Sequence, residues 1–196
     1  MQPVECDLDD AALVQRVQEQ DLAALGRLFD RYYAQVFRTA LAITQEEAAA
    51  DDIVQDCFLK LHRYADRIDT AWPLAPWLYR VTVNLSYTWI ARQRRRRISL
   101  EAVKDYLTSP PGHAPDRAAE QAELQDHVRR AIGELSFNQR VVIVLHYLNG
   151  LSLEEIAEVV ECPVGTVKSR LHYARENLRH KLDAANWTLE LAHGYV

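Results

Sequence analysis

The sequence predicts an all-α protein of two small helical domains, which are joined by a flexible linker and of which the second contains a helix-turn-helix. Three observations lead to this prediction. Apolar residues recur at intervals of three and four along most of the 196-residue chain, and this is the spacing of one helix face. Residues 99–117 include a proline-rich stretch that cannot hold a helix. Near the C-terminus, Cys162 and Pro163 interrupt two short helical patterns.

The composition excludes several classes of protein. Hydrophobic residues make up 48 % of the chain and charged residues 26 %, so we expect packed cores and no global disorder. No apolar run approaches the ~20 residues of a membrane span, and the N-terminus lacks the pattern of a signal peptide. We therefore expect a cytoplasmic protein without membrane insertion.

The three cysteines, Cys6, Cys57 and Cys162, are far apart, which favours small buried hydrophobes over disulfides or a metal site.

The first domain is predicted to span residues 1–98. Asp9 or Asp10 can cap a first helix that runs to about Gln20. Apolar side chains at spacings of three and four over residues 22–37 predict a second, amphipathic helix.

Two more helices are predicted in this domain. Residues 44–47, TQEE, have the pattern of a capping box that opens a helix through Tyr64. Two prolines predict a loop over residues 66–76, because proline interrupts a helix. A long helix then follows over residues 76–97 and ends in a run of arginines.

Residues 99–117 are predicted to be an acidic linker between the domains. The wider segment 99–127 carries two basic and six acidic side chains. The second domain is predicted over residues 118–184, and the tail over residues 185–196 is left without a structural assignment.

Helix signals recur in the second domain. Residues 136–139 (SFNQ) and 152–155 (SLEE) each have the pattern of a capping box. Gly150 between them suits a helix C-terminus, and a last helix is predicted to run from the turn at Pro163 to about Ala184.

The last predicted helix has an apolar side and a basic side. The residues on the apolar side of a helical wheel are Val164, Val167, Leu171, Ala174 and Leu178. The basic side carries Lys168, His172, Arg175 and Arg179. A helix of this kind suits the major groove of DNA, with its flanks on phosphates. An ordinary solvated basic face is the alternative interpretation.

Five stretches of the sequence resemble the motifs of bacterial sigma factors of the extracytoplasmic-function (ECF) group. They are ADDIVQDCFLKLH at 50–62, LAPWLYRVTVNL at 74–85, ELSFNQRVV at 134–142, GLSLEEIA at 150–157 and ECPVGTVKSRL at 161–171. The resemblance covers roughly residues 20–183, with both motif sets in the expected order. It implies a protein that binds core RNA polymerase, reads the −35 and −10 promoter elements and helps to open DNA.

The resemblance also implies roles for individual residues. Those implied to bind core polymerase are Asp51, Asp52, Gln55, Asp56 and Phe58. Those implied at the −10 element and in melting are Trp72, Arg80, Asn84, Tyr87, Arg92, Arg94 and Arg95. Those implied at the −35 element are Thr166, Lys168, Ser169, Arg170, His172, Tyr173 and Arg175. An anti-sigma factor is a further partner that the family implies.

The sequence gives less support to two other classes of function. A stand-alone helix-turn-helix regulator would need a receiver or ligand-binding domain with strands upstream, where residues 1–98 predict only helices. An enzyme would need a phosphate loop, a metal-ligand pattern or a nucleophile with its base, and we find none of these in the sequence. We therefore predict no catalytic residue, metal, cofactor or small-molecule substrate.

Overall fold

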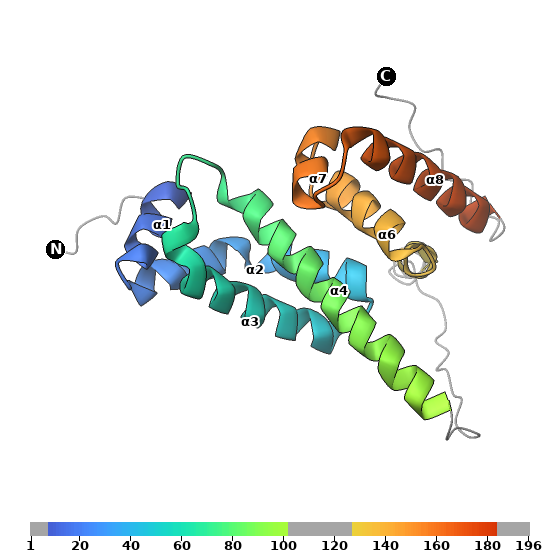
Figure 1. Ribbon diagram of the computed structural model, residues 1–196, viewed down its shortest axis with the longest axis horizontal. Helices are drawn as coiled ribbons and strands as arrows, with labels where there is room; N and C mark the ends of the chain where they lie inside the picture. Colours follow the sequence, from blue (N-terminus) through green and yellow to red (C-terminus); the bar gives the residue numbers. More distant parts are fainter. Residues whose placement is uncertain (1–7, 102–126, 184–196) are drawn as a thin grey trace, which may run out of the picture.

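The computed structural model describes residues 8–101 and 127–183, and every regular element in these two ranges is helical (Figure 1). We call residues 8–101 the first module and residues 127–183 the second module. The all-α prediction is thereby confirmed. No helix in the two described ranges is both long enough and apolar enough to cross a lipid bilayer.

The first module consists of four α-helices and one short 3-10 turn. The elements are α1 (Asp10–Gln18), α2 (Leu22–Thr44), α3 (Glu47–Tyr64), η1 (Ala65–Arg67) and α4 (Leu74–Glu101). Carboxylates cap the first two helices: Asp9 accepts from the N–H of Ala12, and Asp21 accepts from those of Ala23 and Ala24. These bonds satisfy N–H groups that have no partner within a helix.

Fully buried aliphatic side chains from all four helices form the core of the first module. They include Leu13, Leu28, Val36, Val54, Leu61 and Leu78. Gln45 adopts a left-handed conformation, with φ of 64°, and separates α2 from α3 with Glu46. The chain therefore reverses within two residues, and α2 and α3 lie side by side (Figure 1).

Two predictions about helix starts in this module were wrong. Thr44 does not cap α3, because it is the last residue of α2 and its hydroxyl donates to the carbonyl of Ala40 at 2.8 Å. The N-cap of α3 is Glu46, which makes no side-chain capping bond. Pro76 does not belong to a loop, since it lies in the first turn of α4, where its missing N–H costs nothing.

The second module is a compact set of short helices followed by one long helix. Residues 127–133 are helical, and the elements after them are α6 (Phe137–Ile143), the π-turn η2 (Val144–Leu148), α7 (Leu153–Val159) and α8 (Val164–Asp183). Both predicted capping boxes, at Ser136 and Ser152, are confirmed. Gly150 follows η2 with φ of 71°, a conformation that glycine adopts without strain.

The apolar side of α8 packs as the sequence predicts, with one exception. Val167, Leu171 and Ala174 are buried in one core with Ile156 and other residues of α6 and α7. Val164 is 38 % exposed, because it is the first residue of α8 and lies beyond the edge of this core.

The predicted boundaries fall partly outside the described residues. α4 continues to Glu101, past the boundary predicted at residue 98. The rest of the predicted linker and the tail from residue 185 lie outside the described residues, as does Cys6.

We predict that Leu28→Ala lowers the free energy of unfolding by about 2–5 kcal/mol, since Leu28 is fully buried and its loss leaves a cavity. Urea denaturation followed by circular dichroism measures the change. Leu59→Ala is the matched control, because Leu59 is 61 % exposed and should shift stability by no more than about 0.5 kcal/mol. Equal effects of the two changes would contradict this description of the core.

We predict that the thiol of Cys57 is unreactive in the folded protein at pH 8. Cys57 is fully buried, and burial raises its pKa from 9.0 to about 12. The thiol therefore stays protonated in the folded protein up to about pH 12, whereas it ionises in the unfolded chain above about pH 9. The contribution of this group to the free energy of unfolding is thus complete below pH 9 and is lost as the pH rises from 9 to about 12. Maleimide labelling with peptide mass spectrometry measures the reactivity. Equal labelling of Cys57 with and without guanidinium would contradict its burial.

Candidate functional site

An exposed polar and basic surface covers the first three turns of α8. Its exposed residues are Lys168, Ser169, His172, Tyr173 and Arg175. The rings of His172 and Tyr173 meet edge to face, with centroids 5.4 Å apart. Five of the seven residues predicted for the −35 element thus lie together on one exposed surface, and Thr166 lies half-buried in the first turn beside them. We call this surface the α8 face.

Tyr147 borders the α8 face, although no sequence motif predicts this position. Arg175 donates from Nε to the hydroxyl of Tyr147 at 2.7 Å, and its guanidinium also lies over the Tyr147 ring. Tyr147 is itself exposed and belongs to the π-turn η2. The extra residue of a π-turn shifts the helical register, so a helical wheel of the sequence does not place Tyr147 correctly.

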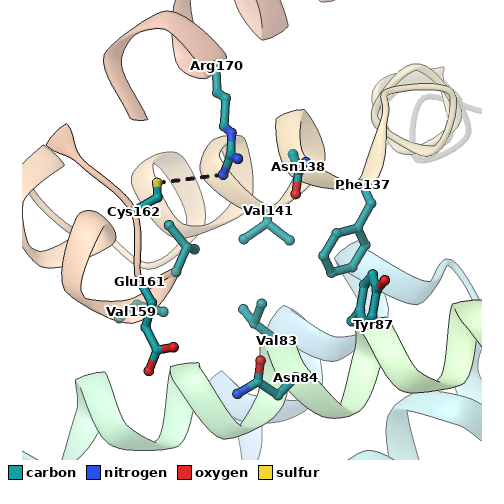
Figure 2. Close-up of a pocket in the computed structure, with 11 residues that line it drawn as sticks. Val83, Asn84, Tyr87, Phe137, Asn138, Val141, Val159, Glu161, Cys162 and Arg170 are labelled. Carbon is teal, nitrogen blue, oxygen red and sulfur yellow. Dashed lines mark hydrogen bonds between the residues drawn. The ribbon is translucent and has the colours of Figure 1, made fainter. Parts of the chain in front are cut away.

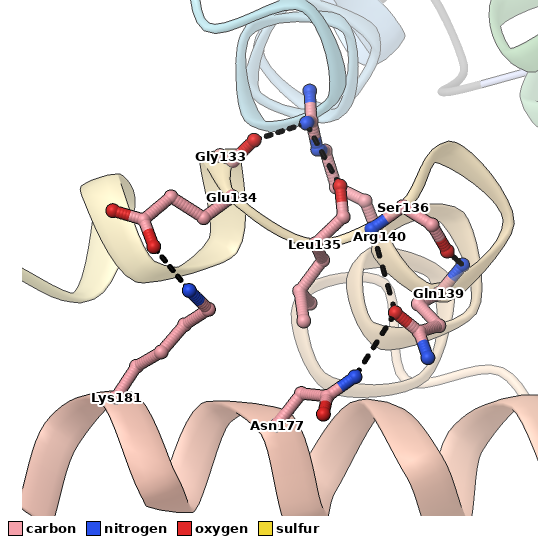
Figure 3. Close-up of polar contacts among 8 residues, drawn as sticks. All are labelled: Gly133, Glu134, Leu135, Ser136, Gln139, Arg140, Asn177 and Lys181. Atoms are coloured by element: carbon pink, nitrogen blue, oxygen red, sulfur yellow. Dashed lines mark hydrogen bonds and ion pairs between the residues drawn. The ribbon is translucent and has the colours of Figure 1, made fainter.

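The far end of α8 is fixed to the segment that precedes and begins α6. Lys181 forms an ion pair with Glu134, and the amide of Asn177 donates to Gln139 (Figure 3). Gln139 also completes the capping box at Ser136. These contacts hold the C-terminal half of α8 against its own module, whereas the polar side of its N-terminal half stays exposed.

Arg170 lies apart from the other residues predicted for the −35 element. It is half-buried, and its Nη1 lies 3.7 Å from the sulfur of Cys162 (Figure 2). Both side chains line a cavity of about 340 Å³ between the two modules. In this conformation Arg170 therefore points toward the first module and away from the α8 face.

The residues predicted for the −10 element follow α4 and the loop before it. Trp72 lies in that loop and is 74 % exposed, so it does not pack into the core. Asn84 and Tyr87 are exposed on α4, and Asn84 lines the cavity (Figure 2). Arg92, Arg94 and Arg95 are exposed near the end of α4. We call these residues together with Arg80 the α4 face.

The second module contacts the α4 face directly. Arg80 donates from Nη2 to the carbonyl of Glu158 at 2.5 Å, and its Nη1 lies 3.4 Å from the carboxylate of Glu161. The ring of Tyr87 meets that of Phe137, with centroids 5.3 Å apart. The second module thus contacts two of the seven residues predicted for the −10 element, although Tyr87 stays 59 % exposed.

An acidic ridge runs along the outer side of α3. Asp52, Gln55 and Asp56 are exposed on it, and Asp51 is half-buried beside the hydroxyl of Tyr33. The exposed side chain of Leu59 gives the ridge an apolar edge.

Phe58 is not part of the exposed ridge, contrary to the expectation from the sequence. It is only 5 % exposed, and its ring packs on that of Phe29 at 4.9 Å. Phe58 therefore supports the ridge from within the core, and Leu59 takes the exposed apolar position.

Comparison with known proteins assigns a family to each of the two modules. Residues 28–96 match the family model of sigma-70 region 2, and residues 125–178 match that of sigma-70 region 4. The ECF RNA polymerase sigma-E factor of Escherichia coli (strain K12) is 35 % identical over 184 residues, which cover 89 % of this chain and 95 % of that protein. The chain belongs to the ECF sigma factors.

Other relatives of this sigma factor support the assignment. The sigma-E factor of Haemophilus influenzae is 34 % identical over 89 % of this chain and 96 % of its own length. CnrH, solved in complex with the cytosolic domain of CnrY, superimposes with a TM-score of 0.66 and 27 % identity, covering 89 % of this chain and 97 % of CnrH. The sigma factor RpoE of Bartonella quintana, solved with the anti-sigma factor NepR, gives 0.65 and 25 %, covering 81 % and 96 %.

Membership in this family gives the sigma factor a role in transcription initiation. The α4 face and the acidic ridge lie within region 2, and the α8 face lies within region 4. The prediction of the family from the sequence is therefore confirmed, whereas the roles of the individual residues stay predictions.

Proposed function

We propose that this sigma factor docks on core RNA polymerase through the acidic ridge, reads the −10 element with the α4 face and reads the −35 element with the α8 face. The observation that carries this proposal is the separation of the three surfaces on one chain. The ridge is acidic, whereas the α4 and α8 faces carry exposed arginine, lysine and hydrogen-bonding side chains. Each surface suits a different partner.

The α8 face has the chemistry for reading duplex DNA. Lys168 is exposed and can donate to guanine O6 and N7 in the major groove. His172 and Tyr173 offer further donors and ring faces, and Arg175 can meet a phosphate with its remaining N–H groups. Tyr147 fixes the orientation of Arg175, which favours its use as a positioned phosphate contact.

The α4 face has the chemistry for single-stranded DNA. The amide of Asn84 can both donate to and accept from the edge of an unpaired base. The exposed ring of Trp72 can stack on a base, an interaction worth about 1–3 kcal/mol. The exposed arginines at positions 92, 94 and 95 suit the phosphates beside the melted segment.

The acidic ridge suits a basic partner surface. Its exposed carboxylates would attract cationic groups and set the orientation of docking, and Leu59 would add apolar contact at the edge. In this proposal residues 1–98 act as the polymerase-binding and −10 domain, residues 118–184 act as the −35 domain, and residues 99–117 connect them.

We further propose that the protein acts in the cytoplasm, is not an enzyme and is regulated by an anti-sigma factor. The relatives CnrH and RpoE were solved with CnrY and with an anti-sigma factor, respectively, which supports a partner of this kind. The alternative, a stand-alone helix-turn-helix regulator, is not favoured, because it predicts strands upstream and residues 8–101 contain only helices.

The decisive experiment combines binding with transcription. The purified chain should associate with core RNA polymerase and direct it to start sites mapped after overexpression in the native bacterium. A stand-alone regulator would instead bind duplex DNA without polymerase and would not support initiation. Failure to associate with core polymerase would overturn the proposed function.

We predict that Asp52→Lys combined with Asp56→Lys weakens binding to core polymerase by about tenfold or more, because the ridge becomes repulsive to a basic surface. Surface plasmon resonance with immobilised core polymerase measures the affinity. Asp66→Lys is the control, since Asp66 is an exposed carboxylate beyond the end of α3. Equal losses from both changes would indicate a general charge effect.

We predict that Lys168→Ala costs about 1–3 kcal/mol of holoenzyme binding at one matched base pair of the −35 element. Fluorescence anisotropy with promoter duplexes that vary at each position identifies the base pair. Lys181→Ala is the control on the same helix, because Lys181 is paired with Glu134. A loss that is equal on all sequences would make Lys168 a phosphate contact.

We predict that Asn84→Ala lowers promoter opening by about tenfold, equivalent to ~1.4 kcal/mol, while initial duplex binding by the holoenzyme is retained. Permanganate footprinting measures opening, and filter binding measures the initial complex. Asn177→Ala removes an amide that lies on the second module and should leave opening unchanged. Normal bubble formation by Asn84→Ala would show that this residue does not contact an unpaired base.

A further inference from the structure

Tyr147 and Arg175 form an exposed pair at the edge of the α8 face, and they come from two different elements, η2 and α8. The Nε of Arg175 donates to the hydroxyl of Tyr147 at 2.7 Å, and its guanidinium carbon lies 5.5 Å from the centroid of the ring. The ring of His146 meets that of Tyr147 edge to face, with centroids 4.9 Å apart. Two contacts therefore orient the phenol ring.

Both side chains of this pair keep hydrogen-bond donors that no described residue uses. The hydrogen bonding of Arg175 within residues 8–101 and 127–183 involves Nε alone, so both Nη groups remain available as a fork of donors. The phenol oxygen of Tyr147 accepts from Nε and still has its own O–H to donate, for which these two ranges offer no acceptor. The pair therefore presents donors and a positive charge to solvent.

The pair is not needed to hold η2 against α8. Val144 and Leu145 of η2 are buried in the same core as Leu171 and Ala174 of α8, and this apolar packing joins the two elements. Tyr147, in contrast, is 57 % exposed. A hydrogen bond between groups that water also reaches adds little to stability, because folding exchanges one partner for another. The exposed donors therefore suit a ligand better than a purely structural role.

We infer that Tyr147 and Arg175 together bind one backbone phosphate of duplex DNA, with the phenol O–H and the two Nη groups donating to its oxygens. We call these two side chains the phosphate clamp. The inference deepens the proposed function of the α8 face and rests on it, because it adds a residue of η2 to the surface that holds the −35 element.

The chemistry of the clamp fits a phosphate. A guanidinium fork matches two phosphate oxygens, and hydrogen bonds from a cation to an anion are stronger than those between neutral groups. Lys168 is exposed on the same helix, seven residues before Arg175 and thus about 10 Å away along the axis. A phosphate contact carries no sequence information and fixes the register of a recognition helix. The clamp would therefore position Lys168 for reading a base.

Three variants separate the clamp from general effects on the protein. Tyr147→Phe removes the O–H and keeps the ring beside the guanidinium. Arg175→Ala removes the charge and the fork. Tyr64→Phe is the matched control, because Tyr64 is a half-buried tyrosine at the C-terminal end of α3 in the first module. This control also loses one hydroxyl, but at a place outside the α8 face.

The test measures binding of the holoenzyme to duplexes that carry the −35 element, in which one phosphate at a time is replaced by a neutral methylphosphonate. Fluorescence anisotropy gives the affinity. We expect one replacement to weaken wild-type binding about tenfold, because charge-assisted hydrogen bonds to that phosphate are lost. At the same phosphate the loss should fall to about threefold in Tyr147→Phe and to about one- to twofold in Arg175→Ala. Tyr64→Phe should match the wild type at every position.

Several results would overturn the inference. Tyr147→Phe would overturn it by keeping the full wild-type loss at every phosphate, since the phenol would then make no contact. So would sensitivity lost at different phosphates in the two clamp variants, or an equal change in Tyr64→Phe. Weaker association of Tyr147→Phe with core polymerase at unchanged phosphate sensitivity would assign the pair to an acidic protein surface instead.

The same duplexes are measured with the full chain alone at low salt. Failure of the wild type to associate with core polymerase would count against the proposed function, and the phosphate pattern of the chain alone would then decide the inference. No sensitive phosphate in either measurement would overturn it. A loss at one base pair in Lys168→Ala, together with unchanged binding by Tyr147→Phe, would leave the proposed function standing and remove the clamp.

Discussion

The helix α4 packs its apolar side chains into two different cores, and the arrangement of the whole described structure depends on this division. Leu74 and Leu78 pack with α1, α2 and α3, whereas Tyr79 and Val83 pack with the second module. The polar residues of the α4 face project from the same helix. The second module contacts two of them, Arg80 and Tyr87, whereas Trp72 and the arginines at positions 92, 94 and 95 stay exposed.

Helix signals that depend on neighbouring residues alone were predictable from the sequence. The capping boxes at Ser136 and Ser152 form because hydroxyl, amide or carboxylate groups three residues apart satisfy each other. The same pattern failed at Thr44, because Thr44 is the last residue of the preceding helix and its hydroxyl donates to a carbonyl of that helix. A local signal is reliable only where no adjacent element competes for the same group.

Features that depend on tertiary contacts were not predictable in this way. The resemblance to the family implied the residues of the acidic ridge, but the burial of Phe58 depends on Phe29 of another helix. The role of Tyr147 beside Arg175 depends on a π-turn that has no clear sequence pattern. The contacts of Arg80 and Arg140 join residues more than 75 positions apart, and a sequence that suggests a flexible connection gives no reason to expect them.

Arg140 is a half-buried cation whose partners among the described residues include no carboxylate, and this has a consequence for hydration. Its guanidinium is held by carbonyl groups of Ile43, Gly133 and Leu135, and its Nε has no partner among the described residues. Burial, together with the charge of Arg94, lowers the pKa of Arg140. The carbonyl groups replace only part of the hydration that the guanidinium would have in water. The cost of this incomplete solvation opposes the hydrogen bonds of Arg140, so the net stabilisation that this residue gives to the joint between the modules is smaller than the number of its bonds suggests.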